Sequence, residues 1–194
     1  MKNWRIRLEP WIIQDGNYGE FSVEQKASFA LEIFWLGDVV RLPSASDKGA
    51  EPLAGSQYRI TAQVIHSMPD WWVVDFGLRA YCMSAPPKDL KAGQFVGGEI
   101  DLGIDPFTYF ERKALEVGAP ELIYDWQLTE ILKITTPLRT QKTWGGRPKP
   151  SIADPSHRHI MTIAKTKAWQ DEIPHEELRY ELHGELRGGP RRAL

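Results

Sequence analysis

Carboxylates are concentrated in one short segment, residues 99–105, which reads EIDLGID. Because alternate residues of a strand point to one face, Glu99, Asp101 and Asp105 would share a side of the sheet. Carboxylates placed in this way can bind a divalent cation or share a proton. The simpler interpretation, which we favour, is a solvent-facing polar side with Asp105 as a helix cap. We therefore expect no catalytic residue and no metal site, and a hydrolase that uses Glu99, Asp101 and His66 stays open as an alternative.

Histidines offer a second possible metal site. In an extended segment His157 and His159 would point to the same side, and with His66, or with His175 and His183, they could bind zinc. No spacing typical of a zinc site accompanies them, so we interpret them as surface residues. The sequence also lacks the glycine-rich nucleotide-binding loops, the GxSxG elbow, the HExxH motif and the CxxC pair. We expect no cofactor.

Cys82 is the only cysteine, and this excludes an intrachain disulfide. It ends a run of alternating apolar residues that begins at Trp72. A reactive cysteine needs a partly exposed, electropositive setting. We therefore expect Cys82 to be a small, buried hydrophobic residue.

The opposite side of that run holds the best candidates for a binding surface. Trp71, Asp75 and Arg79 alternate with the apolar residues, so they should face away from Trp72, which we assign to the core. Two interpretations of Trp71 are open. Either the N-terminal segment or the C-terminal strands cover it, or it belongs to an exposed aromatic patch, which would mark a binding surface. We expect Trp71 to be less buried than Trp72. The candidate binding residues are Trp71, Asp75, Arg79 and Trp144.

Alternating apolar residues dominate the first 136 positions. Six such patterns occur, separated by turn-forming residues, and they predict strands within residues 4–8, 29–35, 58–64, 72–82, 96–104 and 124–134. Each strand has one apolar face. This pattern predicts a mainly β protein in which a mainly antiparallel sheet curls into a small antiparallel barrel or sandwich.

One short helix is predicted near residues 106–117. Asp105 and Pro106 form a typical helix start, and Gly118 and Pro120 a typical end. From residue 57 the element order is then strand, strand, strand, helix, strand. This order resembles that of the OB fold, in which a helix lies between the third and fourth strands of a five-stranded barrel.

Charge divides the chain near residue 136. Residues 137–194 hold 11 basic and 7 acidic residues, whereas residues 1–136 hold 13 basic and 19 acidic residues. We expect a barrel body at 1–136, made of an N-terminal hairpin at 1–42 and an OB-like core at 57–136. A linker at 137–156 would lead to a partly ordered C-terminal extension at 157–194 that adds one or two strands. Residues 177–187 fit a strand slightly better than a helix, with residues 160–169 as the partner strand.

These features favour a non-enzymatic binding or interaction protein of a bacterial accessory or immunity type. Its partner would be another protein or a second copy of the chain. Single-stranded nucleic acid, bound through an OB-like face and the basic C-terminal region around Trp144, is an alternative. The acidic body disfavours it, since phosphates need a basic groove.

No apolar run in the chain is long enough to cross a membrane. The longest runs have four residues, as at Ile33–Leu36 and Trp71–Val74. The N-terminal residues also lack the apolar stretch of a secretion signal. We therefore expect no membrane partner and a cytoplasmic location.

Overall fold

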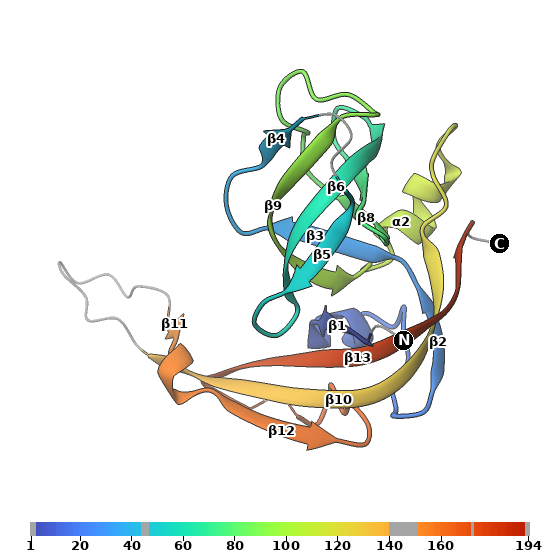
Figure 1. The fold of residues 1–194 in the computed structure, drawn as a ribbon. Helices are drawn as coiled ribbons and strands as arrows, with labels where there is room; N and C mark the ends of the chain where they lie inside the picture. Colours follow the sequence, from blue (N-terminus) through green and yellow to red (C-terminus); the bar gives the residue numbers. More distant parts are fainter. Residues whose placement is uncertain (1–2, 44–46, 140–150, 172, 193–194) are drawn as a thin grey trace.

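The computed structural model describes residues 3–43, 47–139, 151–171 and 173–192. The protein is mainly β, with 53% of residues in strands and 9% in helices. This confirms the predicted fold class, a mainly β structure with a closed barrel and a short helix. Figure 1 shows the barrel above a sheet of much longer strands.

Thirteen strands and two short α-helices occur in the described residues. The helices are α1 (Pro10–Gln14) and α2 (Thr108–Glu111), with 3-10 turns at Lys113–Leu115 and Pro155–His157. The strands are β1 (Asn3–Leu8), β2 (Lys26–Phe29), β3 (Leu31–Trp35), β4 (Val40–Leu42), β5 (Gly49–Pro52), β6 (Gln57–Ser67), β7 (Trp72–Asp75), β8 (Arg79–Cys82), β9 (Phe95–Ile104), β10 (Ile123–Arg139), β11 (Ile152–Ala153), β12 (His159–Ile163) and β13 (Glu176–Arg191).

The barrel contains β3, β8, β7, β6 and β9, and it closes because β9 pairs with both β6 and β3. Four of its pairings are antiparallel, and β3 runs parallel to β8. Strand direction cannot alternate all the way round a closed ring with an odd number of strands. The barrel is therefore mainly antiparallel, with one parallel pair.

The pattern predicted as one strand over residues 72–82 is a hairpin. β7 and β8 pair with Trp72 opposite Cys82 and Val74 opposite Ala80. Directly opposite residues of an antiparallel pair point to the same face, so the alternation continues unbroken through the three-residue turn. Gly77, with a φ of 100°, allows that turn. Cys82 is buried, as expected.

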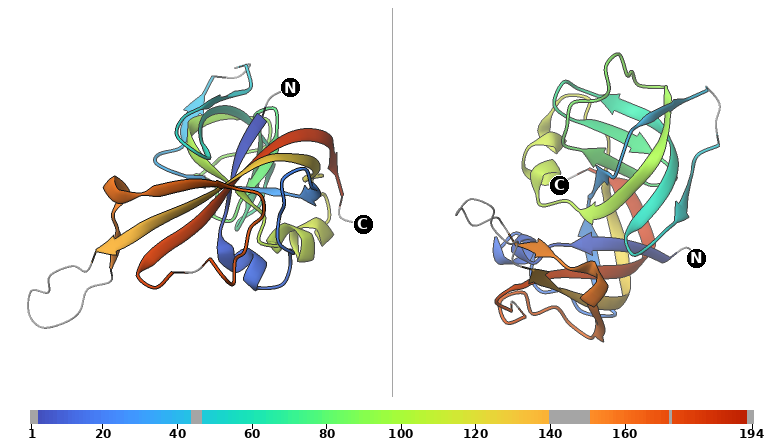
Figure 2. Two further views of the ribbon diagram at one scale, coloured as in Figure 1. Left: turned by 90° about the horizontal axis from the view of Figure 1, so that it is seen from below. Right: turned by 90° about the vertical axis from the view of Figure 1, so that its left-hand side faces the viewer.

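The remainder of the same continuous sheet lies beside the barrel and includes its two longest strands, β10 and β13, and we call this part the long sheet. It contains β1, β13, β10 and β12, all antiparallel, and β2 pairs with β10 beyond the end of β12. Figures 1 and 2 show β10 and β13 running side by side past the barrel. Leu178, Tyr180 and Leu182 of β13 belong to the same buried cluster as the barrel interior.

The long sheet changes the expected organisation in three ways. The proposed boundary at residue 136 falls inside β10, which pairs with β13, β12 and β2, so the OB-like order over 57–136 is not confirmed. β1 pairs with β13 and not within an N-terminal hairpin. Residues 177–187 are a strand, as favoured, but the expected partner segment forms β12, which pairs with β10. Much of the predicted linker, at 140–150, lies outside the described residues.

α2 is shorter than predicted, and its N-cap is Phe107 and not Asp105, although the Asp105 side chain still binds the first turn. The Asp105 carboxylate accepts hydrogen bonds from the backbone N–H groups of Tyr109 (3.0 Å) and Phe110 (3.3 Å). The helix begins only at Thr108 because Phe107 adopts a left-handed conformation with a φ of 69°. The segment that follows folds over the outer face of the β7–β8 hairpin.

That segment buries Trp71 completely. The Trp71 side chain packs with Tyr109 and Leu122, and its indole N–H donates to Glu116 at 2.9 Å. Trp71 is 0% exposed and Trp72 is 1% exposed. The expectation that Trp71 is the more exposed of the two was therefore wrong. Its cover comes mainly from residues 109–123, and neither the C-terminal strands nor an open surface accounts for it.

Trp71→Ala should lower the free energy of unfolding by about 3–5 kcal/mol, as much as Trp72→Ala, because each change leaves a cavity where a buried ring was. Trp169, which is 70% exposed, supplies the control, and Trp169→Ala should cost less than about 0.5 kcal/mol. Chemical denaturation measures all three. A Trp71→Ala cost as small as that of Trp169→Ala would contradict the described cover.

Candidate functional site

The binding residues predicted from the sequence do not form an exposed patch. Asp75 pairs with Lys48 at 2.8 Å, and the backbone N–H of Arg79 donates to the Tyr124 hydroxyl at 2.7 Å. Both residues are half-buried across the hairpin from each other, beside the buried Trp71. Trp144 lies outside the described residues.

The three residues of the hydrolase alternative are also held apart. Glu99 is exposed and pairs with Arg59 at 2.8 Å. Asp101 is 5% exposed and lies opposite Gln57 in the pairing of β9 with β6. His66 lies nine residues further along β6, which is roughly 30 Å of extended strand. Within the described ranges no group of three or more His, Cys, Asp or Glu residues could hold a metal ion.

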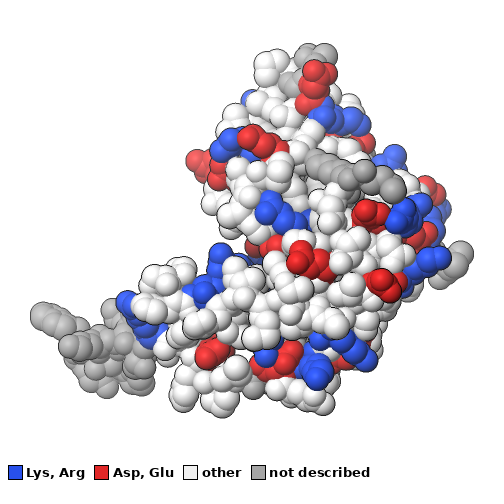
Figure 3. All heavy atoms as spheres, turned by 60° about the horizontal axis from the view of Figure 1, so that its bottom comes forward, with Lys and Arg blue, Asp and Glu red and all other residues white. Residues whose placement is uncertain are grey.

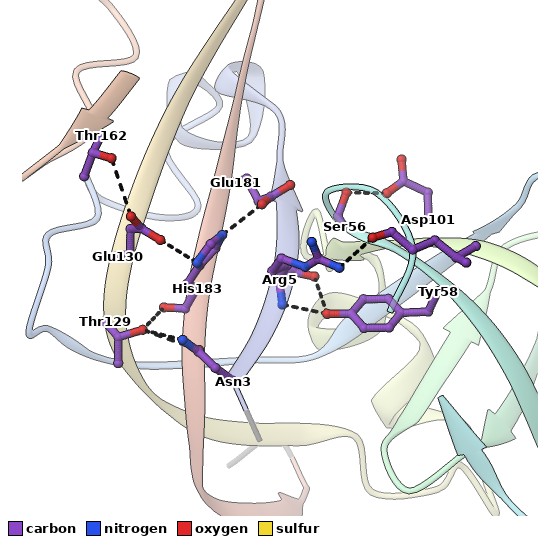
Figure 4. Close-up of polar contacts among 11 residues, drawn as sticks. Asn3, Arg5, Ser56, Tyr58, Asp101, Thr129, Glu130, Thr162, Glu181 and His183 are labelled. Carbon is purple, nitrogen blue, oxygen red and sulfur yellow. Dashed lines mark hydrogen bonds and ion pairs between the residues drawn. The ribbon is translucent and has the colours of Figure 1, made fainter. Parts of the chain in front are cut away.

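Asp101 instead belongs to a polar contact between β1 and the barrel, shown in Figure 4 with its neighbours. Its carboxylate accepts from the Ser56 hydroxyl at 2.5 Å and from the Arg7 guanidinium at 2.8 Å. Arg5, two residues earlier on β1, donates its backbone N–H to the Tyr58 hydroxyl at 2.7 Å and a guanidinium N–H to the Leu53 carbonyl at 3.0 Å. We call this set of contacts the seam.

The Tyr58 hydroxyl acts as both acceptor and donor in the seam, since it also donates to the Arg5 carbonyl at 3.3 Å. Burial raises the pKa of Tyr58 above its ordinary value, and the contacts with Arg5 oppose this only in part. The phenol therefore stays protonated across the physiological range, and both of its bonds to β1 persist.

His183 of β13 connects two carboxylates on the same side of the long sheet. Its Nδ1 lies 2.7 Å from Glu130, and its Nε2 lies 2.8 Å from Glu181 (Figure 4). The Glu181 side chain is only 6% exposed, whereas that of Glu130 is 40% exposed. The loop before β6 closes over Glu181, where a Cβ on Gly55 would lie 2.7 Å from the Glu181 Oε2 atom. Gly55 also adopts a left-handed conformation with a φ of 58°, which favours glycine at this position.

Beside this histidine, a groove of about 240 Å³ separates the long sheet from the loop before β6. Its floor is apolar, and its rim is basic. Leu132, Ile134 and Ile160 form the floor, and Arg5, Arg158 and Arg179 form the rim. Figure 3 shows Lys and Arg side chains along the inner edge of the protruding end of the long sheet, beside the notch that separates it from the barrel.

Two of the three arginines are not held by a short contact in the part of the chain that the structure describes, although Arg179 acts electrostatically on Glu9. Arg158 and Arg179 form no hydrogen bond or ion pair there. Ile160 lies next to them and is 53% exposed. Guanidinium groups that form no hydrogen bond, placed beside a partly exposed apolar floor, can hold an anionic ligand that also carries apolar groups.

The sequence placed none of these three arginines in a site. Alternation assigns Arg5 and Arg179 to the polar faces of their strands, but it does not reveal that β1 and β13 are neighbours. Arg158 directly precedes β12, which pairs with the edge of β10 opposite to the one that pairs with β13. Only the pairing of residue 5 with residue 183, and of residue 134 with residues 160 and 179, brings them to one surface.

In comparisons with known proteins, no family model matches the chain, and no match is found among curated proteins or among solved structures. Among the described residues no helix has the length and the apolar character needed to cross a membrane. The groove must therefore be interpreted from its own chemistry.

His183→Ala should lower the free energy of unfolding by about 1–3 kcal/mol, because it leaves the buried Glu181 carboxylate without its hydrogen-bond donor. Glu130→Ala removes the partner on the other side of the same ring. It should cost less than about 1 kcal/mol, because Glu130 is largely solvated. Urea denaturation of the two variants compares them directly. Equal costs would show that Glu181 does not depend on His183.

Proposed function

We propose that the protein is a non-enzymatic binding protein that holds an acidic segment of a partner protein in the groove. The observation that carries this proposal is the placement of Arg158 and Arg179 over the apolar floor of Leu132, Ile134 and Ile160. A bound segment would place carboxylates against the guanidinium groups and an aliphatic side chain on the floor. Such an interface combines an apolar centre with a charged rim.

The lining of the groove favours a peptide over single-stranded nucleic acid. Proteins that bind single strands stack the bases on aromatic side chains. The groove is lined by Arg5, Gly55, Leu132, Ile134, Arg158, Ile160, Arg179, Glu181 and His183, none of which is Trp, Tyr or Phe. Two carboxylates already engage the His183 ring.

A binding role fits the chemistry better than a catalytic one. The candidate catalytic residues lie apart, and both ring nitrogens of the half-buried His183 are engaged by carboxylates. As part of the same proposal we place the protein in the cytoplasm. Its single cysteine is a buried free thiol, which is compatible with a reducing compartment.

Fluorescence polarisation with a short fluorescein-labelled peptide of glutamate and leucine tests the proposal. Arg158→Glu/Arg179→Glu should weaken binding by about tenfold or more, and added salt should weaken wild-type binding. Lys88→Glu/Lys91→Glu makes the same change in net charge on the loop between β8 and β9, and it should leave the affinity within about twofold.

Two results would overturn this assignment. Equal losses in the two double variants would mean that net charge and not the groove controls binding. Tighter binding of a labelled oligo-dT strand than of the peptide, lost in Arg158→Glu/Arg179→Glu, would establish the nucleic-acid alternative instead. Size-exclusion chromatography at rising protein concentration shows whether the bound segment belongs to a second copy of the chain.

A further inference from the structure

A second cavity, of about 210 Å³, lies against the outer face of the barrel where α1 and β1 approach β3. Its walls are largely apolar and include Trp11, Ile12, Phe34 and Pro106. Trp11 is 51% exposed and Phe34 is 40% exposed, so both rings flank an open mouth. Glu32 lines the same cavity.

Glu32 is a largely buried residue, and its side chain lines this cavity. The residue is 7% exposed, and its carboxyl forms no hydrogen bond or ion pair with any residue in the described ranges. On β3, Leu31 and Ile33 point into the barrel, so Glu32 points outward, where α1 and β1 cover it. Buried carboxyl groups in folded proteins are normally hydrogen-bonded or paired.

The nearest cation is already engaged by other groups. Arg7 donates to Asp101 at 2.8 Å, lies 3.2 Å from Glu9 and covers the Phe34 ring at 4.4 Å. Asp105, on the other side, is held by the Tyr81 hydroxyl at 2.5 Å and by backbone N–H groups. Carboxylates therefore outnumber cations around the cavity.

This environment opposes ionisation of Glu32. The pKa of Glu32 is raised to about 7, mainly by burial and secondly by the Asp105 carboxylate, while Arg7 opposes the rise in part. Burial also raises the pKa of Glu9 at the mouth, and burial and Asp105 raise the pKa of the Tyr81 phenol. A bound cation would relieve the cost of the charged form.

We propose that this cavity binds an alkylammonium group, with the Glu32 carboxylate as its counterion and the Trp11 and Phe34 rings against its carbon chain. The carboxylate requires a positive charge, and the apolar walls require that the charge be attached to a hydrocarbon. A metal ion fits poorly, because it needs several oxygen ligands and Glu32 is the one carboxylate lining the cavity that forms no hydrogen bond or ion pair with a described residue. This site is separate from the groove and does not depend on the function proposed for it.

Isothermal titration calorimetry with n-butylammonium chloride measures binding directly. Because the charged form of Glu32 binds the cation, the affinity should rise about tenfold between pH 6 and pH 8, across the raised pKa. Glu32→Gln should abolish the pH dependence and weaken binding about tenfold or more. Glu51 is an exposed carboxylate on β5, and Glu51→Gln should leave both the affinity and its pH dependence unchanged. n-Butanol, which lacks the charge, should not compete.

The source of the ammonium group is distinguished by a second probe, N-acetyl-lysine methylamide. Binding of both probes identifies a lysine side chain of a partner as an acceptable ligand, and binding of n-butylammonium alone identifies a free amine. Absence of n-butylammonium binding overturns the proposal, as does binding that Glu32→Gln leaves unchanged.

Thermal melts of the ligand-free protein provide an independent test of the Glu32 environment. A carboxyl whose pKa is raised on folding binds more protons in the folded than in the unfolded chain, so stability falls as pH rises from 4.5 through 7. The melting temperature of Glu32→Gln relative to wild type should therefore rise from pH 5 to pH 9. A constant difference across this range would show that Glu32 ionises without cost.

Discussion

The ion pair of Arg7 with Asp101 fixes the position of the barrel on the long sheet. Arg7 belongs to β1, whose six residues pair with β13, and Asp101 belongs to β9 of the barrel. The side chains are 21% and 6% exposed, and Ser56 donates to the same carboxylate. Removing one partner of such a pair leaves an uncompensated buried charge. β1 otherwise has one ladder contact with the barrel, between Arg7 and Gly103.

Both candidate sites depend on this placement of β1. The groove uses Arg5 on its rim, and the Glu32 cavity uses Arg7 and Glu9 in its wall. Alternate residues of one strand thus provide the polar contacts of the seam and the borders of two cavities, while Trp4, Ile6 and Leu8 point into the core. A displaced β1 would open both sites at once.

Local patterns predicted the strands, and pairing between distant segments decided the rest. Alternation located strands that overlap β1, β3, β6, β9 and β10, and it indicated which faces are buried. It could not detect the turn at Gly77, because both arms of a hairpin keep the same alternation. It also could not show that β13 lies between β1 and β10. Trp71 was misjudged because its cover comes from residues 109–123, and Glu32 was overlooked because one carboxylate in a strand resembles a solvent-facing residue.

Native-state hydrogen exchange tests most directly whether the seam makes the barrel and the long sheet one cooperative unit. Amides of β9 in the barrel and of the β10–β13 pair should exchange through the same opening, with free energies that agree within about 0.5 kcal/mol. Asp101→Asn should lower the opening free energies of the β9 amides and of the β10–β13 amides by the same amount. If the β10–β13 amides open at a free energy about 2 kcal/mol or more below that of the β9 amides, the two parts unfold separately and the account is wrong.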